Sequence, residues 1–498
     1  MKKLVACAGL VAAVLIPAAL TPAAAAAPPG GALDAAAVDR YVNDYLRRTG
    51  LPGAMVAVTR GDQVVRAAGY GHGADGRAVT ARTPMPVASL SKSFTALAVM
   101  RLVEAGRVDL DAPVRRYLPE FRLADPRAAR ITVRQLLNQT SGMADSAFPD
   151  LTLPQPDTLT GAVARMRGAE LATAPGTRMS YHNPNYFVAA RLVEVVAGVP
   201  FAEYMSAEVF GPIGMADTTT VDSTAEMPGA ARGYIRAYGQ VIPRAHPRWF
   251  TNGGHGVVTT ATDLSRWLIT QNSGGRTADG RQVVSDRSIE TMWTPPKGGT
   301  YGMGWRRGGP EHGSTWVQHT GWLLTHNSVQ ILVPDEGYGV AVVANTGMSP
   351  DDDSVLIARG LVDLAQGRTP EPTAPFTMTA DLVLAGLTIL ALALGARGAL
   401  RSQRWARRRA GHPLWRTVLR LSPYALPLVI FASLASIFGF LYNRAGTMEQ
   451  ITYLWLPLYV WLGTAALAGA VVIAARGFHL IRAGRRPSDV PPAVPPRP

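Results

Sequence analysis

Residues 89–104 read Ser89-Leu-Ser-Lys92-Ser-Phe-Thr-Ala-Leu-Ala-Val-Met-Arg-Leu-Val-Glu104, and they carry the strongest signal in the chain. Their apolar residues recur at the spacing of a buried helix face, and Gly106 follows as a stop signal. A serine and a lysine three positions apart on a helix lie on the same face. This arrangement suits a serine nucleophile beside its base.

The lysine of this stretch is informative because lysine is rare, with four lysines among the 49 basic residues of the chain. Arginine fills the other 45 basic positions, and arginine does not lose its proton in a protein. A buried lysine can lose its proton and then act as a base. Lysine at position 92 therefore favours a catalytic amine over the plain alternative, a surface serine and lysine near a helix start.

The basic charge of the chain lies at its ends. Of the formal charge of +14, Lys2 and Lys3 supply +2, and residues 397–420 with 476–498, holding 13 arginines and one acid, supply +12. Residues 28–396 hold 33 basic and 33 acidic residues, so their net charge is zero. Because the charge flanks apolar segments and does not form a basic groove, we expect no nucleic-acid partner.

The sequence contains no convincing motif for a metal or a cofactor. The single cysteine, Cys7, lies in the leader, and the nine histidines are scattered. Residues 71–76 fit G-x-G-x-x-G, but no helix is predicted to follow, so we do not expect a nucleotide loop. A G-x-S-x-G elbow, an H-E-x-x-H motif and a P-loop are missing from the sequence. We therefore expect neither a metal nor a cofactor.

The N-terminus is predicted to direct export. Residues 1–27 combine two lysines, an apolar run and a stretch of small residues, as in a secretory signal peptide, with an uncleaved anchor as the alternative. We therefore expect residues 28–366 to form one exported domain. The polar linker 367–377 would join this domain to the membrane.

Three apolar segments near the C-terminus predict a multi-pass protein of the cell membrane. The predicted order is transmembrane helix 378–396, cytoplasmic loop 397–420, transmembrane helix 421–442, extracellular loop 443–450, transmembrane helix 451–475 and cytoplasmic tail 476–498. The first loop carries eight arginines and no acid, and the tail carries five arginines, so both are predicted to lie inside. The lipid bilayer is thus the expected partner of three helices, and the C-terminus is expected in the cytoplasm.

Periodicity and turn residues predict an α+β domain. Strands are predicted at residues 53–58, 63–68, 314–319, 327–333 and 338–345. Helices are predicted at residues 33–49, 89–104, 131–138, 160–168, 185–197, 201–209, 261–271 and 354–366. Early strands, a helical middle and late strands imply a sheet that joins both ends of the domain.

Two further motifs follow the serine and lysine in a fixed order: Tyr181-His182-Asn183, and His319-Thr320-Gly321. With Ser-x-x-Lys, this series resembles the serine β-lactamase and penicillin-binding protein superfamily, in the branch related to class C β-lactamases and D-Ala-D-Ala carboxypeptidases. Residues 131–142 resemble its LLxHTSG stretch, with Gln139 where histidine is usual. Residues 253–264 resemble its GGxxST-x-DL turn. The resemblance covers about residues 35–365 and implies an antiparallel sheet flanked by helices plus an all-helical domain.

The resemblance also implies roles for the motif residues. Ser89 would be the acylated nucleophile, and Lys92 with Tyr181 would serve as its general base. Asn183 would bind the acyl amide of the substrate. The backbone N–H groups of Ser89 and Trp322 would form the oxyanion hole. The expected activity is that of a bacterial serine hydrolase acting on small peptides, amides or esters.

Departures from the family pattern concern the third motif and its surroundings. His319 stands where potent β-lactamases carry lysine, which favours a peptidase or esterase over an efficient β-lactamase. His319 and Gly321 would line the site, where the histidine helps to bind a substrate carboxylate or carbonyl. After Gly321 the sequence is bulkier and more apolar than is usual, which indicates a reshaped pocket. His255 and Asn327 are either substrate contacts or satisfied loop residues, and the sequence leaves both interpretations open.

The sequence also allows two alternatives to a general serine hydrolase. A penicillin-binding sensor or non-catalytic binding module would use the same pocket, but the cytoplasmic segments are only an arginine-rich loop and a short tail. The architecture of an exported hydrolase with three spans also resembles the prodrug-activating peptidases of nonribosomal-peptide pathways, which would make the substrate an N-acyl-D-amino-acid amide. That narrower interpretation rests on architecture and on no pocket residue.

Overall fold

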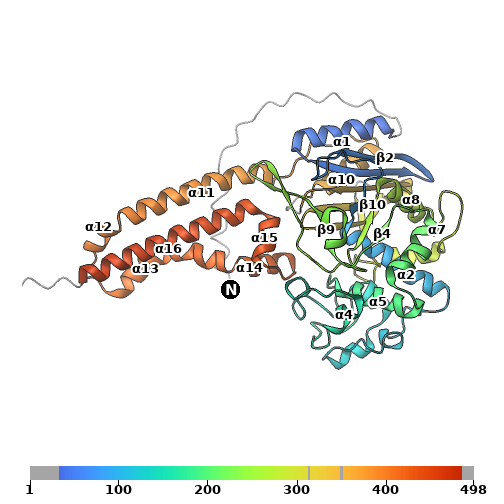
Figure 1. The fold of residues 1–498 in the computed structure, drawn as a ribbon, viewed down its shortest axis with the longest axis horizontal. Coiled ribbons are helices and arrows are strands. Elements are labelled where there is room, and N and C mark those ends of the chain that lie inside the picture. The colour runs from blue at the N-terminus through green and yellow to red at the C-terminus, as the bar shows by residue number, and fades with distance from the viewer. Residues whose placement is uncertain (1–32, 312–313, 348–351, 485–498) are drawn as a thin grey trace, which may run out of the picture.

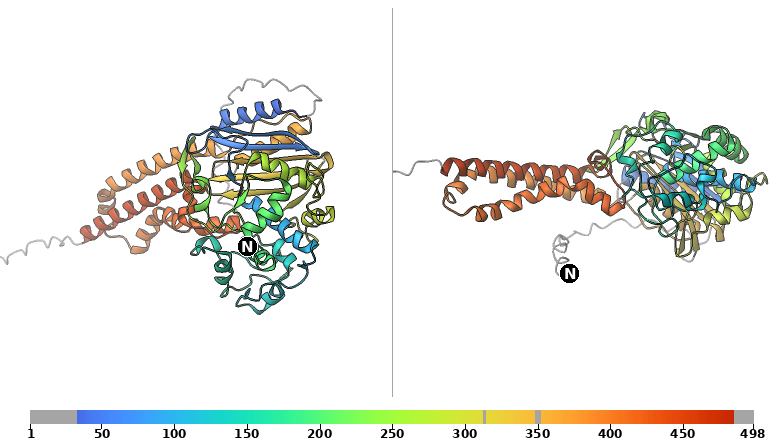
Figure 2. Two further views of the ribbon diagram at one scale, coloured as in Figure 1. Left: turned by 45° about the vertical axis from the view of Figure 1, so that its right-hand side comes forward. Right: turned by 90° about the horizontal axis from the view of Figure 1, so that it is seen from below.

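The computed structural model describes residues 33–311, 314–347 and 352–484, so the predicted signal peptide lies outside the described residues. An α+β domain is followed by a set of helices from Thr377 to Gly484, called the C-terminal module below (Figure 1). Figure 2 shows the module extending away from one side of the domain.

A six-stranded antiparallel sheet with the order β2-β1-β11-β10-β9-β8 forms the centre of the domain. Its strands are β1 (Gly53–Arg60), β2 (Gln63–Gly71), β8 (Arg306–Glu311), β9 (Ser314–Leu323), β10 (His326–Val333) and β11 (Tyr338–Ala344). Val56 of β1 pairs with Val342 of β11, so strands from the two ends of the domain lie side by side. This pairing confirms the predicted α+β class and the sheet that joins both ends.

Helices cover both faces of the sheet (Figure 1). α1 (Ala35–Thr49) and α10 (Asp353–Ala365) pack on one face, whereas α2 (Ser91–Glu104) and α8 (Ala261–Asn272) pack on the other. The two cores share the sheet because alternate residues of each strand point to opposite faces. α2 is buried almost throughout, which fixes its first turn between the sheet and the helical part of the domain.

The middle of the chain forms the expected helical part. Its helices are α3 (Val133–Leu137), α4 (Leu159–Ala164), α5 (Pro184–Ala197), α6 (Phe201–Tyr204) with a π-helical continuation (Met205–Phe210), and α7 (Gly211–Ile213). The structure adds elements that the periodicity did not predict: β8, the hairpin β5 (Gly233–Ala237) with β6 (Gln240–Arg244), helix α9 (Asp286–Trp293), and a small sheet of β3 (Met85–Pro86), β7 (Val257–Thr259) and β4 (Thr219–Thr220).

The C-terminal module consists of α11 (Thr377–Leu400), α12 (Ser402–Arg407), α13 (Leu414–Ala432), α14 (Leu434–Tyr442), α15 (Met448–Leu454) and α16 (Leu456–Gly484). Among the described residues, α11 and α16 are each long and apolar enough to cross a membrane. The segment predicted as the span 421–442 is instead the pair α13 and α14, bent by 54°. Length and composition therefore allow two spans in the module, or three if this bent pair is one span; the other bent pair among the described residues, Pro184–Ala197 with Phe201–Ile213, lies in the helical part of the domain.

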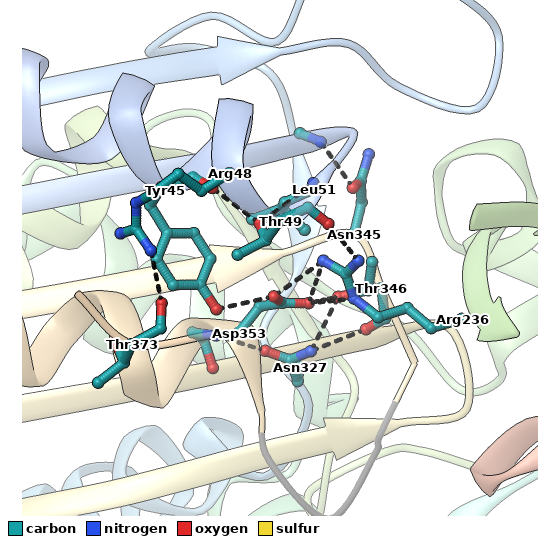
Figure 3. A network of polar contacts seen from close by, with 12 residues as sticks. Tyr45, Arg48, Thr49, Leu51, Arg236, Asn327, Asn345, Thr346, Asp353 and Thr373 are labelled. Carbon is teal, nitrogen blue, oxygen red and sulfur yellow. Dashed lines mark hydrogen bonds and ion pairs between the residues drawn. The ribbon is translucent and has the colours of Figure 1, made fainter. Parts of the chain in front are cut away.

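A buried polar network ties α1, the β5–β6 hairpin and α10 together (Figure 3). Asp353 at the start of α10 accepts hydrogen bonds from Tyr45 Oη at 2.9 Å and from Arg236 Nη2 at 2.9 Å. Arg236 also donates to the carbonyl oxygen of Thr49 at 2.6 Å. Because the Arg236–Asp353 pair is buried, each charge depends on the other for compensation. The network therefore fixes the hairpin to the sheet domain. The hairpin in turn contacts the C-terminal module.

Candidate active site

Ser89 lies in a tight turn directly before the central helix. The residues Ala88–Leu90 form a 3-10 turn, and α2 begins at Ser91, two residues later than predicted. Ala88 is fully buried and has a φ of +50°, in the left-handed region that a residue with a β-carbon rarely adopts. Such strain costs on the order of 1–3 kcal/mol and clusters at functional sites. The turn presents the Ser89 side chain to a pocket.

Lys92 is fully buried next to Ser89. Its Nζ lies 3.1 Å from Ser89 Oγ, 3.0 Å from Asn183 Oδ1 and 2.8 Å from the carbonyl oxygen of Gly254. Burial holds the pKa of the Lys92 amine well below its usual value, and the positive charge of Arg444 lowers the pKa further. Among the described residues no carboxylate forms an ion pair with this amine, so a positive charge on it would be compensated by uncharged groups alone.

Tyr181 borders the same space from the loop before α5. The Nζ of Lys92 lies 4.9 Å from the centroid of the Tyr181 ring. The ring is in edge contact with Tyr301, at 5.8 Å between centroids, and tilted against His319 at 6.1 Å. Burial raises the pKa of the Tyr181 hydroxyl, while Ser89 and the positive charge of Arg444 oppose this shift. The group is therefore a neutral phenol at ordinary pH.

The loop that carries Tyr181 and Asn183 is held by Gln139. Gln139 Oε1 accepts hydrogen bonds from the backbone N–H of His182 at 3.0 Å and from Asn185 Nδ2 at 2.6 Å. Gln139 itself has a φ of +59° and is fully buried. The sequence flagged this residue as a departure from the family pattern but gave no sign of its positioning role.

His319 is neutral and its two ring nitrogens are occupied. Nδ1 lies 2.7 Å from the carbonyl oxygen of Thr320, which can only accept, so Nδ1 carries the hydrogen. Nε2 is then the acceptor for the hydroxyl of Tyr301, at 3.0 Å. Burial lowers the pKa of His319 to about 3, and the positive charge of Arg306 adds to this shift. His319 therefore lines the pocket without supplying a positive charge.

The third motif lies on β9, next to the turn of Ser89. The pairing of β8 with β9 covers Ser314 to Gln318, and residues 319–323 continue beyond it toward the 3-10 turn. A β-carbon on Gly321 would collide with Ser328 Oγ and with the carbonyl oxygen of Val87, so this position requires glycine. Trp322 lines the pocket.

Asn327 and His255, which the sequence allowed either as substrate contacts or as structural residues, lie in different parts of the domain. Asn327 donates to the carbonyl oxygen of Thr346 at 2.9 Å and accepts from the backbone N–H of Ser354 at 2.9 Å, inside the network of Figure 3. Its amide is therefore satisfied within the fold, and Asn327 does not line the pocket of Ser89. His255 is buried, with its ring 6.0 Å from that of Phe187, and it does not line the pocket of Ser89.

The pocket encloses about 390 Å³, within the range of roughly 300–1,000 Å³ that small-molecule sites occupy. One side is formed by Ser89, Tyr181, His319 and Trp322. Much of the remaining lining comes from the C-terminal module, including residues 443–447. This wall was not predicted from the sequence, because a loop with one basic and one acidic residue is typical of a neutral connection. No cluster of three metal-ligating side chains is found in the part of the chain that the structure describes.

Comparisons with known proteins agree with the motifs. Residues 38–364 match the model of the Beta-lactamase family. The chain is 31% identical over 346 residues to penicillin-binding protein 4 of Amycolatopsis lactamdurans, covering 65% of this chain and 89% of that protein. It is 26% identical over 313 residues to the protein flp of Staphylococcus aureus strain N315. The alignment covers 62% of this chain and 62% of that protein, so the chain spans less than two thirds of that relative.

Solved structures are similar over the same domain. The octameric penicillin-binding protein homologue from Pyrococcus abyssi has a TM-score of 0.58 and 26% identity, covering 71% of this chain and 82% of that chain. A D-stereospecific amidohydrolase from Streptomyces sp. has a TM-score of 0.53 and 23% identity, covering 67% of this chain and 98% of that chain. The second likeness concerns the fold alone.

Proposed function

This chain belongs to the Beta-lactamase family of serine hydrolases, and from that premise we propose that it cleaves amide or ester substrates through an acyl-enzyme on Ser89. We place the catalytic domain outside the cell, anchored by the C-terminal module, with residues 397–420 and the C-terminus in the cytoplasm. The substrates we favour are small peptides or amides that contain D-amino acids.

The observation that carries the proposal is the contact between the Lys92 amine and the Ser89 oxygen at 3.1 Å. This amine is buried and has no carboxylate partner among the described residues. In its neutral form the amine has two hydrogens and one lone pair. The hydrogens suit Asn183 Oδ1 and the carbonyl oxygen of Gly254, at 3.0 and 2.8 Å, which leaves the lone pair for the hydroxyl of Ser89. This geometry supports Lys92 as the general base.

The proposed reaction has two halves. In the first, the Ser89 proton passes to Lys92 while Oγ bonds to the substrate carbonyl carbon, and the departing amine or alcohol takes a proton from Lys92 by way of the neutral Tyr181 phenol. In the second, a water loses its proton to Lys92 and its oxygen bonds to the acyl carbon, and Ser89 Oγ leaves that carbon and takes the proton back from Lys92. The N–H groups of Ser89 and Trp322 are our proposed oxyanion donors, and one such donor typically contributes about 2.7–4 kcal/mol.

A labelling experiment on the full chain in detergent tests this proposal. A fluorophosphonate and a fluorescent penicillin should each modify the wild-type protein and should leave the Ser89→Ala variant unmodified. A D-Ala-D-Ala peptide or a short ester should be turned over by the wild type. Lack of labelling by the fluorophosphonate would contradict the proposal. Stable labelling by the penicillin without turnover of any peptide, amide or ester would instead favour a penicillin-binding sensor.

A further inference from the structure

The pocket of Ser89 is closed by a part of the chain that the catalytic motifs do not include. The turn 443–447 links α14 to α15 and lines the same pocket as Tyr181 and His319. Arg444 of this turn lies with its guanidinium carbon 5.9 Å from the centroid of the Tyr181 ring. The C-terminal module therefore contributes a charged side chain to the immediate surroundings of the serine and lysine.

The position of this turn is fixed by contacts along α15 and at its flanks. The backbone N–H of Ala445 donates to Asp145 Oδ2 at 3.0 Å, and Gln450 Nε2 donates to the carbonyl oxygen of Leu151 at 3.2 Å. Tyr453 Oη donates to the carbonyl oxygen of Ala245 at 2.9 Å. These bonds join the module to the helical part of the domain and to the segment after β6. The part of the pocket lining that the module contributes is thus held in place by hydrogen bonds to the domain.

Further bonds join α11 to the same interface. Asp381 near the start of α11 accepts hydrogen bonds from the backbone N–H of Tyr238 at 2.9 Å and from Trp455 Nε1 at 2.8 Å. Asp381 is almost completely buried, so this carboxylate depends on its two donors. The end of the module that meets the domain is therefore held against it by several polar contacts (Figures 1 and 2).

Arg444 has the properties of an anion-binding group. Its side chain is 19% exposed and forms one long ion pair, with Asp145 Oδ2 at 3.9 Å from Nε, beyond hydrogen-bond distance. Its Nε is buried and makes no hydrogen bond within the described residues. His319 occupies the motif position at which potent β-lactamases carry a lysine, and it is neutral with both ring nitrogens engaged. The positive charge at this pocket therefore comes from Arg444 and from the more exposed Arg306.

The same wall is apolar beside the arginine. The apolar residues that the module contributes to the lining include Ala435, Phe438, Ala445, Ile451 and Leu454. Phe438 belongs to α14, which with α13 forms one of the bent apolar helix pairs. A charged group and an apolar surface on one wall suit a molecule that combines an anion with an apolar chain.

We propose that the C-terminal module completes the substrate pocket, and that Arg444 is a specificity-determining residue that binds an anionic group next to the scissile bond of an amphiphilic N-acyl substrate. The acyl chain lies against α14 and α15. This inference rests on the proposed function, because it assigns substrate contacts to the pocket of Ser89. A bidentate contact between guanidinium and carboxylate supplies the recognition.

The test uses the full chain in lipid nanodiscs and measures how compounds slow the fluorophosphonate labelling of Ser89. Two matched pairs differ only in one charge: N-octanoyl-D-Glu anilide against N-octanoyl-D-Gln anilide, and N-octanoyl-D-Ala-D-Ala against its C-terminal amide. Competition does not require turnover, so it reports binding even where hydrolysis is slow. The anionic member of at least one pair should compete about 10–100-fold better in the wild type, as expected for a hydrogen bond to a charged group.

In Arg444→Gln the ratio of competition strengths between the anionic and the neutral compound of a pair should fall toward one. In Arg444→Lys part of this ratio should remain, because lysine keeps the charge but lacks the planar guanidinium group. Arg77→Gln, on an exposed turn where Arg77 pairs with Asp75, is the matched control and should keep the full preference. Replacing octanoyl by acetyl should weaken competition in the wild type.

The results separate this inference from the proposed function. If the wild type is not labelled at all, the proposed function fails and this inference fails with it. If labelling is normal but the wild type shows no charge preference, or Arg444→Gln retains it, only the role of Arg444 is overturned. If the acetyl compounds compete as well as the octanoyl compounds, the apolar part of the substrate assignment is overturned. If Arg444→Gln is not labelled, the Arg444→Lys variant decides the question.

Discussion

At the scale of single residues, the chemistry depends on the protonation of one amine. Three oxygen atoms surround the Nζ of Lys92, and three acceptors would also suit a charged ammonium group. Two facts favour the neutral amine. The group is fully buried without a carboxylate partner among the described residues, and the guanidinium of Arg444 opposes a second positive charge nearby. The neutral form is the one that can accept the proton of Ser89.

Substitution of this amine by a group that stays charged should stop acylation. In Lys92→Arg the positive charge remains, but arginine cannot accept the proton of Ser89. We expect the second-order rate of fluorophosphonate labelling to fall by about 10²–10⁴-fold, the usual contribution of general acid–base catalysis. Lys297→Arg is the matched control, because Lys297 is exposed in a loop. Labelling of Lys92→Arg at the wild-type rate would show that Lys92 is not the general base.

The pH dependence of acylation follows from the lowered pKa of Lys92. The rate should rise with pH as the amine loses its proton, and the midpoint should lie well below the usual pKa of a lysine. The same shift affects stability: between the lowered pKa and the usual one, the unfolded chain binds more protons than the folded chain, so the free energy of unfolding increases with pH. Labelling rates from pH 5 to 10, with thermal unfolding of the wild type and Lys92→Met, measure both effects. A midpoint at the usual lysine pKa would contradict this prediction.

At the scale of elements, the site depends on how closely β9 approaches the turn of Ser89. Gly321 lies against Ser328 of β10 and the carbonyl oxygen of Val87, and no side chain fits between them. The oxyanion donor proposed on Trp322 follows directly in the strand. A small displacement of β9 would therefore move this N–H group relative to Ser89.

Gly321→Ala should reduce labelling by at least about 10-fold, since misplacement of one oxyanion donor costs up to about 2.7–4 kcal/mol of barrier. Overpacking should also destabilise the domain by about 1–3 kcal/mol. Gly308→Ala in the neighbouring strand β8 is the matched control, because a β-carbon there meets no atom within 4 Å. The two variants are compared by labelling rate and thermal unfolding. Equal labelling rates and equal thermal unfolding of the two variants would show that the close packing of Gly321 does not affect the site.

The elements that the sequence predicted are those with a strong local pattern. The strands β1 and β11 and the helices α1, α5 and α8 were predicted nearly to their ends, because buried periodicity and capping residues mark them. β8 was missed because its sequence, Arg306-Arg-Gly-Gly-Pro-Glu311, has few strand-forming residues, and pairing with β9 overrides that preference. Gln139 was seen only as a departure, since its role needs its left-handed backbone and two donors distant in sequence.

At the scale of the whole molecule, the hydrophobic pattern predicted membrane spans but could not predict where the module meets the domain. That contact depends on single polar residues such as Arg244 and Asp381, which carry no periodic signal. The predicted span 421–442 proved to be two helices that meet at a 54° bend, with Ser433 between them. The bend helps to bring the turn with Arg444 over the pocket, so the irregular part of the module is the part that reaches the site.

Arg244 at the end of β6 joins the domain to α15 through three contacts. It donates to the carbonyl oxygen of Thr452 at 3.0 Å and to Thr452 Oγ1 at 2.8 Å, and its guanidinium carbon lies 3.5 Å from the centroid of the Tyr453 ring. Arg244→Gln should therefore free α15, at a cost of about 2 kcal/mol in local opening. Hydrogen–deuterium exchange of residues 447–455 should then be roughly 30-fold faster. The exposed Arg232, replaced by glutamine, is the control. Unchanged exchange in Arg244→Gln would mean that the wall over Ser89 is held by the remaining contacts alone.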